Sequence, residues 1–270
     1  MPENTAVAYD APGTAKAKTN FVLVHGAFHG GWCWDEVAAG LRKAGHTVVA
    51  PDLPGAGEDG TPLSEVTLGT SAERVVETLR SLTEPAVLVG HSMGGVVITQ
   101  VAAQVPELVA RLVYVTAFRP VHGESLLDLS QRPEGAGDMV QPNITIGGEP
   151  PVGTFDLTQA ASVFYNGVPA EVAEQATKRL NPQPVAVYTT PVDLEGVALP
   201  PQEYVVCTQD QAMPLALQLF MANRSPARIH EVDAGHAPFY SHPNEIVKIL
   251  LGESEPRRES GEASAVPAVV

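Results

Sequence analysis

The chain has 270 residues, 44% of them hydrophobic, which is enough to bury one large core and leaves room for a sizeable insertion. It carries 31 acidic against 16 basic residues, and the formal net charge of −15 disfavours binding to nucleic acid or anionic lipid. No stretch approaches the roughly 18 apolar residues that a membrane helix needs. We therefore expect a globular protein whose partners are neither nucleic acid nor a membrane.

The two cysteines, Cys33 and Cys207, lie far apart and do not form the pattern of a disulfide framework. The first residues lack the basic and apolar regions of a signal peptide. The sequence contains no metal-binding motif, and its glycine-rich stretch 26–31 lacks the spacing of a phosphate-binding loop. We therefore predict a cytoplasmic protein without a metal or another cofactor. A homodimer is compatible with the chain, although the sequence does not decide the oligomeric state.

Short β-branched runs alternate with helical stretches through the first half of the chain. After a flexible segment 1–18, with one short strand near 6–9, the pattern predicts strands at 21–24, 47–50, 86–89 and 112–115. Between them it predicts helices at 34–44, at 68–82 and from residue 94 onward. This alternation predicts an α/β fold with a mainly parallel central sheet and helices on both faces.

The alternation lapses at about residue 118 and resumes only after residue 191. The intervening stretch is rich in Pro, Gly and Asn and has short helical patterns such as 170–180, so we interpret 118–191 as an inserted helical cap. The later pattern predicts strands at 204–207 and 228–232 and helices near 215–221 and 244–251. The core is thus expected to comprise 19–117 and 192–252, and 253–270 to form a disordered tail.

The most informative motif is Gly90-His91-Ser92-Met93-Gly94, which directly follows an apolar strand and precedes a helical stretch. It matches the G-x-S-x-G pattern, in which a serine lies on a sharp strand-to-helix turn with its hydroxyl exposed. Glycines flank the serine because the turn strains the backbone and larger neighbours would collide with it. The motif predicts Ser92 as a nucleophile.

A serine hydroxyl is a weak nucleophile unless a base activates it and a further group orients the base. Among eight histidines, His236 is the best candidate base, because it follows a predicted strand late in the chain. Asp210 also follows a predicted strand, and the chain order serine, acid, histidine favours it as the acid. A helix-capping role would suit this carboxylate as well. Asp233 is too close to His236 in sequence to orient it easily, and Glu124 and Asp128 fall in the cap.

The chemistry also needs an oxyanion hole, a pair of backbone amides directed at the charge that develops on a carbonyl oxygen. We expect one amide from Met93, after the nucleophile, and the other from Ala27 in the loop that follows the first long strand. In the same region, His25 is expected to be structural, His91 to lie behind the reacting groups and His29 to line the pocket mouth.

A substrate pocket is expected between the sheet edge and the cap. A mostly apolar pocket would suit a small or medium ester with a hydrophobic acyl part, or a lactone. Arg119 is a candidate partner for a substrate carboxylate, although a salt-bridged or solvated arginine is the more common case. Ordinary core packing is at least as probable as ligand contact for each candidate lining residue; these residues are Phe28, Trp32, Phe118, Leu126, Phe164, Tyr165 and Met213.

Three segments, 21–32, 90–95 and 207–210, resemble the plant methylesterase and hydroxynitrile-lyase group of α/β hydrolases. The likeness continues through Ala117-Phe118-Arg119-Pro120 and the histidine loop, and it covers roughly residues 19 to 250. The resemblance implies an α/β-hydrolase fold with Ser92, Asp210 and His236 as the triad and Ala27 and Met93 as the oxyanion hole.

Two departures from this group bear on its activities. The lyases carry a threonine where this chain has Gly26, and a lysine where it has Ala237. Without the lysine, no cation would stabilise departing cyanide, whereas an unobstructed Gly26 suits an esterase-type oxyanion hole. The resemblance therefore implies ester hydrolysis rather than cyanohydrin cleavage.

We therefore favour a carboxylic ester hydrolase that forms an acyl-enzyme on Ser92 and acts on a small-molecule substrate. Two alternatives stay open: the same triad serving C–C cleavage or a biosynthetic tailoring step, and a ligand-binding protein without catalysis on the same fold. An epoxide hydrolase or dehalogenase is disfavoured, because those enzymes use a carboxylate nucleophile where this chain has a serine.

Overall fold

The computed structural model describes residues 18–256. Nearly all of the segment 1–18, the strand expected near 6–9 and most of the tail 253–270 lie outside the described residues. Cys33 and Cys207 are both buried and unpaired. Within 18–256, no helix combines the length and the apolar character needed to cross a bilayer.

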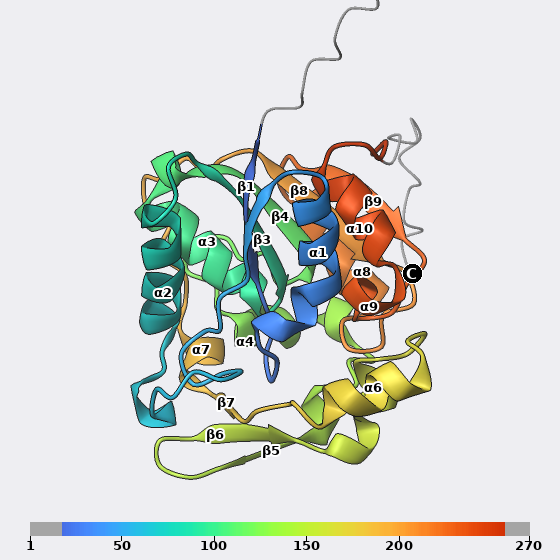
Figure 1. The fold of residues 1–270 in the computed structure, drawn as a ribbon. Helices are drawn as coiled ribbons and strands as arrows, with labels where there is room; N and C mark the ends of the chain where they lie inside the picture. Colours follow the sequence, from blue (N-terminus) through green and yellow to red (C-terminus); the bar gives the residue numbers. More distant parts are fainter. Residues whose placement is uncertain (1–17, 257–270) are drawn as a thin grey trace, which may run out of the picture.

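A six-stranded sheet forms the centre of the molecule, and all its neighbouring strands are parallel (Figure 1). In sheet order the strands are β2 (Thr47–Val49), β1 (Asn20–Val24), β3 (Ala86–Ser92), β4 (Val109–Ala117), β8 (Gln202–Cys207) and β9 (Arg228–Val232). Apolar β-branched residues dominate the central strands because both faces are covered. Along β1, for example, Phe21 and Leu23 pack into one core, and Val22 and Val24 into the other. The predicted parallel sheet is confirmed.

Helices cover both faces of this sheet (Figure 1). One core contains residues of α2 (Leu68–Arg80), α3 (Gly94–Gln104) and α8 (Leu215–Asn223). The other contains residues of α1 (Asp35–Lys43), α9 (Pro238–Ser241) and α10 (Pro243–Leu250). Short 3-10 helices occur at Gly31–Trp34, Leu63–Glu65, Pro106–Leu108, Pro133–Gly135, Gln141–Asn143 and Leu157–Gln159.

The segment between β4 and β8 lies across the end of the sheet where β3 ends (Figure 1). Its helices are α4 (Leu126–Ser130), α5 (Ala160–Val163), α6 (Ala170–Thr177) and α7 (Ala186–Thr189). It also contains an antiparallel sheet of β5 (Ile144–Gly147), β6 (Val152–Phe155) and β7 (Gln183–Pro184). The sequence analysis predicts only helices here. The small sheet escapes prediction because its strands have two to four residues, too few to establish an alternating pattern.

Candidate active site

Ser92 is the last residue of β3 and lies on the sharp turn into α3. Its φ of 52° falls in the left-handed region, which is rare for residues other than glycine. A Cβ atom at Gly90 would lie 2.7 Å from the carbonyl oxygen of Gly94. A Cβ atom at Gly94 would lie 2.7 Å from the carbonyl oxygens of Val24 and His25. The turn therefore fits only glycine at both flanking positions of the motif.

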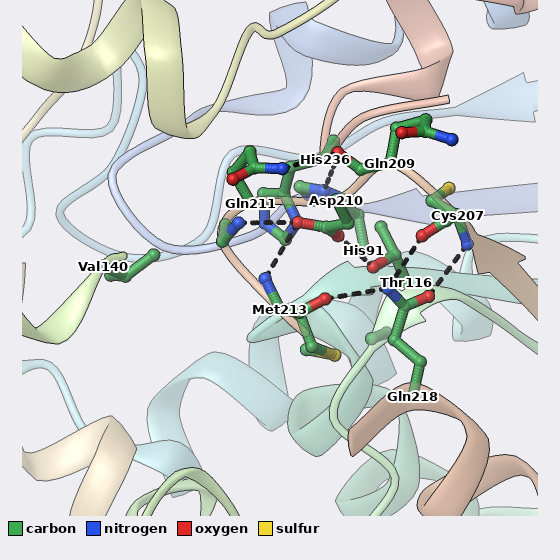
Figure 2. Close-up of polar contacts among 12 residues, drawn as sticks. His91, Thr116, Val140, Cys207, Gln209, Asp210, Gln211, Met213, Gln218 and His236 are labelled. Atoms are coloured by element: carbon green, nitrogen blue, oxygen red, sulfur yellow. Dashed lines mark hydrogen bonds and ion pairs between the residues drawn. The ribbon is translucent and has the colours of Figure 1, made fainter. Parts of the chain in front are cut away.

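His236 and Asp210 lie on the loops that follow β9 and β8, and they meet beside β3 (Figure 2). Nδ1 of His236 donates a hydrogen bond to Oδ2 of Asp210 at 2.7 Å. Only 4% of the His236 side chain and none of the Asp210 side chain is exposed. With its proton on Nδ1, the imidazole keeps Nε2 as its basic nitrogen. His236 and Ser92 line the same cavity.

The Asp210 carboxylate is held by several donors besides His236 (Figure 2). Its Oδ1 accepts the backbone amides of Ala212 at 2.7 Å and Met213 at 2.8 Å. Its Oδ2 also accepts the hydroxyl of Thr116 at 2.5 Å. One oxygen thus organises the local turn, as a capping carboxylate would, while the other orients the histidine. Asp210 does not cap a helix, because α8 begins at Leu215 and its N-cap residue is Pro214, without a side-chain hydrogen bond.

Thr116 is a positioning residue that the sequence analysis missed. The register of β4 against β3 shifts at this point, because His91 pairs with Val115 and Ser92 with Ala117. Thr116 is therefore left out of the ladder, and its φ of 37° is unusual for a β-branched residue. This bulge allows its hydroxyl to reach Asp210. The only sequence signal is a polar residue near the end of an apolar strand.

Hydrogen bonds that do not involve the Asp210 carboxylate join the loops that follow β8 and β9. The side chains of Thr208 and Gln209 both donate to Oδ1 of Asp233, each at 2.9 Å. Nδ2 of Asn166, from the cap, donates to the carbonyl of Gln209 at 2.7 Å. A Cβ atom at Gly235 would lie 2.4 Å from the Asn166 carbonyl oxygen, so the cap also packs closely against the loop that carries His236. Asp233 therefore braces the loops and does not contact the imidazole.

Two buried histidines support the site without facing the reaction. Nε2 of His91 donates to the carbonyl of His236 at 2.8 Å. Nε2 of His25 accepts the amide of Leu53 at 3.0 Å, and its Nδ1 lies 2.8 Å from the carbonyl of Gly26. Burial lowers the pKa of both imidazoles, so both are neutral at physiological pH. These positions match the supporting roles expected for them.

A hydrogen-bond chain fixes the loop that carries Ala27. Nδ1 of His29 donates to the carbonyl of Ala27 at 2.8 Å, and Nε2 of His29 accepts the hydroxyl of Tyr165 at 2.9 Å. Burial lowers the pKa of His29 to about 3, so the ring is neutral. Phe28, between the two bonded residues, has a φ of 65°. His29 thus lines the cavity from a buried position and not from an exposed mouth.

The two candidate oxyanion donors, Ala27 and Met93, line the cavity together with Ser92. Within residues 18–256, neither backbone amide donates a hydrogen bond to another protein group. Met93 is the cap residue of α3, so its amide lies at the positive end of the helix dipole. The arrangement leaves both amides available to a ligand oxygen.

The cavity between the sheet edge and the cap has a volume of ≈ 200 Å³. Most of its wall is apolar. Five of the predicted lining residues contribute to it: Phe28, Phe118, Leu126, Phe164 and Met213. Further residues come from cap elements that the sequence analysis did not connect to the site: Leu127, Ser130, Asp138, Val140, Gln141, Ile144, Ile146 and Tyr188.

Trp32 and Tyr165 do not line this cavity, which corrects the prediction for these two residues. The Trp32 ring stacks on His29 with centroids 5.4 Å apart, and the Arg179 guanidinium lies 4.5 Å from its centroid. Tyr165 directs its hydroxyl to His29. Both aromatic residues therefore pack behind the cavity wall. The sequence alone does not distinguish this position from one in the wall, because the difference depends on tertiary packing.

Arg119 does not contribute to the cavity wall. Its guanidinium donates to the side-chain oxygen of Gln202 at 2.7 Å and to the carbonyl of Met221 at 2.9 Å. Only 2% of Arg119 is exposed, and the side chain ties the start of the cap to α8. It is therefore not placed to bind a substrate carboxylate.

Comparison with known proteins agrees with the fold. Residues 21–249 match the alpha/beta hydrolase family, and the chain belongs to that family. It is 34% identical over 239 residues to a carbendazim hydrolyzing esterase from a Nocardioides species, covering 86% of this chain and 98% of the relative. It is 32% identical over 251 residues to methyl jasmonate esterase 1 from Vitis vinifera, covering 87% of this chain and 96% of the relative.

Solved structures extend this likeness to three dimensions. A pyrethroid hydrolase from Sphingobium faniae superposes with a TM-score of 0.78 at 29% identity, covering 87% of this chain and 97% of that structure. Polyneuridine aldehyde esterase also gives a TM-score of 0.78, at 26% identity, covering 87% and 99%. Within the alpha/beta hydrolases, the chain is thus an enzyme of the carboxylic ester hydrolase class, as the sequence analysis expects.

Proposed function

We propose that this enzyme hydrolyses a small-to-medium carboxylic ester or lactone through an acyl-enzyme on Ser92. The observation that carries the proposal is the 2.7 Å hydrogen bond from His236 to Asp210, beside a strained Ser92 that lines the same apolar cavity. A protein that only bound a ligand would have no need for a buried, oriented imidazole that shares a cavity with a half-buried serine.

In the first half of the reaction, Oγ of Ser92 attacks the ester carbonyl while Nε2 of His236 takes the hydroxyl proton. Asp210 stabilises the imidazolium that forms, and the amides of Ala27 and Met93 stabilise the negative charge on the carbonyl oxygen. As the tetrahedral intermediate collapses, the imidazolium gives its proton to the departing alkoxide, which leaves as an alcohol.

In the second half, a water molecule attacks the acyl-enzyme and His236 takes one of its protons. The resulting tetrahedral intermediate collapses and breaks the bond between the acyl carbon and Oγ of Ser92. The imidazolium returns the proton to this oxygen and releases a carboxylic acid. The hydrogen bond to Asp210 holds the ring in one orientation through both halves, so the same nitrogen acts as base and acid.

Two positions support ester hydrolysis over cyanohydrin cleavage. Ala237, after the catalytic histidine, is buried and provides no cation to stabilise departing cyanide. A Cβ atom at Gly26 would lie 2.9 Å from Cβ of Ser92 and 2.8 Å from Nδ1 of His91, so a larger residue there would displace the nucleophile or the ring behind it. The absence of a side chain at Gly26 keeps the approach to the Ala27 amide open.

The test is kcat/KM for p-nitrophenyl esters of increasing acyl length, measured for the wild type and for Ser92→Ala, Asp210→Asn and His236→Ala. We expect the Ser92 and His236 variants to lose about 10³-fold or more in kcat, because they remove parts of one catalytic unit. Glu124→Gln is the control: this cap acid pairs with Arg224 away from the cavity, and its activity should stay within about threefold of wild type. Full ester turnover by Ser92→Ala would refute the proposal.

A further inference from the structure

One carboxylate in the cavity wall has no part in the proposed mechanism. Asp138 lines the same cavity as Ser92 and His236. Among the described residues that line this cavity, it is the only acidic side chain, and there is no lysine or arginine. The wall around it is otherwise mostly apolar, so a single negative charge determines the electrostatic character of the pocket.

The Asp138 carboxylate is held in a fixed place. Its Oδ1 accepts the amide of Val140 at 2.5 Å, and its Oδ2 accepts Nε2 of Gln141 at 2.8 Å. The backbone amide of Met139, the residue after Asp138, donates to the carbonyl of Gln211 at 3.2 Å. This hydrogen bond joins this part of the cap to the loop that carries Asp210. The carboxylate is thus anchored beside the reacting groups.

The half-buried carboxylate of Asp138 has hydrogen-bond donors but no cationic side chain beside it in the cavity wall. It accepts from the Val140 amide, from Nε2 of Gln141 and from the backbone of Gln141, whereas its two oxygens together can accept about four donors. Burial raises the pKa of this carboxyl, and the hydrogen bonds from Gln141 and Val140 and, to a smaller extent, His236 act in the opposite direction. A carboxylate in an apolar cavity is costly unless it is paired with a cation or further donors, and no side chain of the cavity wall supplies a permanent cation.

We propose that Asp138 is a specificity-determining residue that favours esters carrying a cationic ammonium group on an otherwise apolar body. The inference rests on the proposed ester hydrolysis. A cationic group that reached the carboxylate would compensate its desolvation, whereas a neutral group of the same shape would gain only packing. An ester with a free carboxylate would be repelled.

The experiment compares isosteric esters that differ only in charge. Acetylcholine and 3,3-dimethylbutyl acetate place the charge in the alcohol, and the p-nitrophenyl esters of betaine and of 3,3-dimethylbutanoic acid place it in the acyl group. The cationic-to-neutral ratio of kcat/KM is measured for the wild type and for Asp138→Asn. Dividing the wild-type ratio by the Asp138→Asn ratio cancels the intrinsic reactivity of each ester.

We expect Asp138→Asn to lower this ratio about tenfold in at least one pair, the size of one hydrogen-bonded or paired charge. Asparagine retains the size of the side chain and an acceptor oxygen for Val140 but loses the acceptor for Gln141, so each neutral ester serves as the reference for its cationic partner in the same protein. Asp128→Asn is the matched control. It removes the same charge from the third residue of α4, which does not line the cavity, and the ratio should not change.

A second measurement needs no variant and so does not depend on how Asp138→Asn folds. The wild-type ratio is divided by the ratio for hydroxide-catalysed hydrolysis of the same esters, and a preference of about tenfold for the cation is expected in at least one pair. If neutral esters turn over but neither measurement shows a cation preference, the inference is overturned and ester hydrolysis stands. If the wild type cleaves no ester of either kind, both fail.

Discussion

At the scale of single residues, the strained backbone of this protein coincides with the candidate site. Among the described residues other than glycine, positive φ angles occur at Phe28, Ser92 and Thr116. These residues belong to the loop that carries Ala27, to the nucleophile turn and to the bulge that holds Asp210. Each such conformation costs about 1–3 kcal/mol and persists only where the surroundings impose it. The strain is thus stored where the proposed chemistry needs fixed geometry.

Two tyrosines with buried hydroxyls should contribute differently to the free energy of unfolding. The hydroxyl of Tyr188 is buried and has no hydrogen-bond partner among the described residues, whereas that of Tyr204 donates to the carbonyl of Ala117 at 2.8 Å. Tyr204→Phe should lower the free energy of unfolding by about 1 kcal/mol or more, because it leaves a buried carbonyl unpaired. Tyr188→Phe should cost less than about 0.5 kcal/mol, because it removes an unsatisfied group.

Urea unfolding of both variants alongside the wild type checks this prediction. An equal loss of stability in the two variants would mean that the Tyr188 hydroxyl does have a partner in solution. An unchanged stability for Tyr204→Phe would contradict the value given to its hydrogen bond.

At the scale of elements, the close approach of α3 to the end of β4 depends on a glycine. A Cβ atom at Gly95 would lie 2.2 Å from the carbonyl oxygen of Phe118, which is backbone and has little freedom to move. Gly95→Ala should therefore destabilise the protein by about 3 kcal/mol or more, because the helix must shift away from the sheet.

Gly69, in the first turn of α2, is the control for this prediction. It is exposed, and the nearest atom to an added Cβ is the Thr67 hydroxyl at 3.6 Å. Gly69→Ala should raise stability by about 0.5 kcal/mol, because alanine loses less backbone entropy in a helix. Thermal unfolding measures both variants. A Gly95→Ala protein as stable as wild type would show that the packing of α3 is looser than the structure indicates.

Much of the core could be predicted from the sequence, because its elements have strong local patterns. The β-branched run of β1 and the amphipathic repeat of α2 are long enough to be identified alone. The small cap sheet was missed because β7 has only two residues. Its strands are held by pairing across the cap and not by their own composition.

The same distinction applies to the site. Ser92 is marked by glycines adjacent in sequence, and the order of Asp210 and His236 along the chain narrows the choice of partners. Thr116, by contrast, acquires its position from a register shift between two strands. Asn166 acquires its position from a contact between the cap and the loop at Gln209, 43 residues away. No single-sequence pattern encodes either contact, because both depend on how distant elements meet.

At the scale of the whole molecule, buried histidines make stability depend on pH. Burial lowers the pKa of His25 and of His91, and it lowers the pKa of His29 to about 3. In the unfolded chain these residues titrate near 6.5, so below that pH the unfolded state binds more protons than the folded state. The free energy of unfolding should therefore fall by about 1–2 kcal/mol for each of the three histidines between pH 7.5 and 5.

Urea unfolding at several pH values tests this expectation. His29→Gln should reduce the pH dependence by the share of one histidine. A wild-type free energy of unfolding that stays constant between pH 7.5 and 5 would contradict the neutral, buried state assigned to these rings.

An activated Ser92 should react with a covalent serine reagent, whereas an ordinary serine hydroxyl should not. Intact mass is recorded after incubation with a serine-directed fluorophosphonate, for wild type and Ser92→Ala in parallel. We expect one adduct on the wild type and none on the variant, because only a hydroxyl that is activated by a base reacts readily. The same adduct on both proteins, or none on either, would contradict the assignment of Ser92 as the catalytic serine.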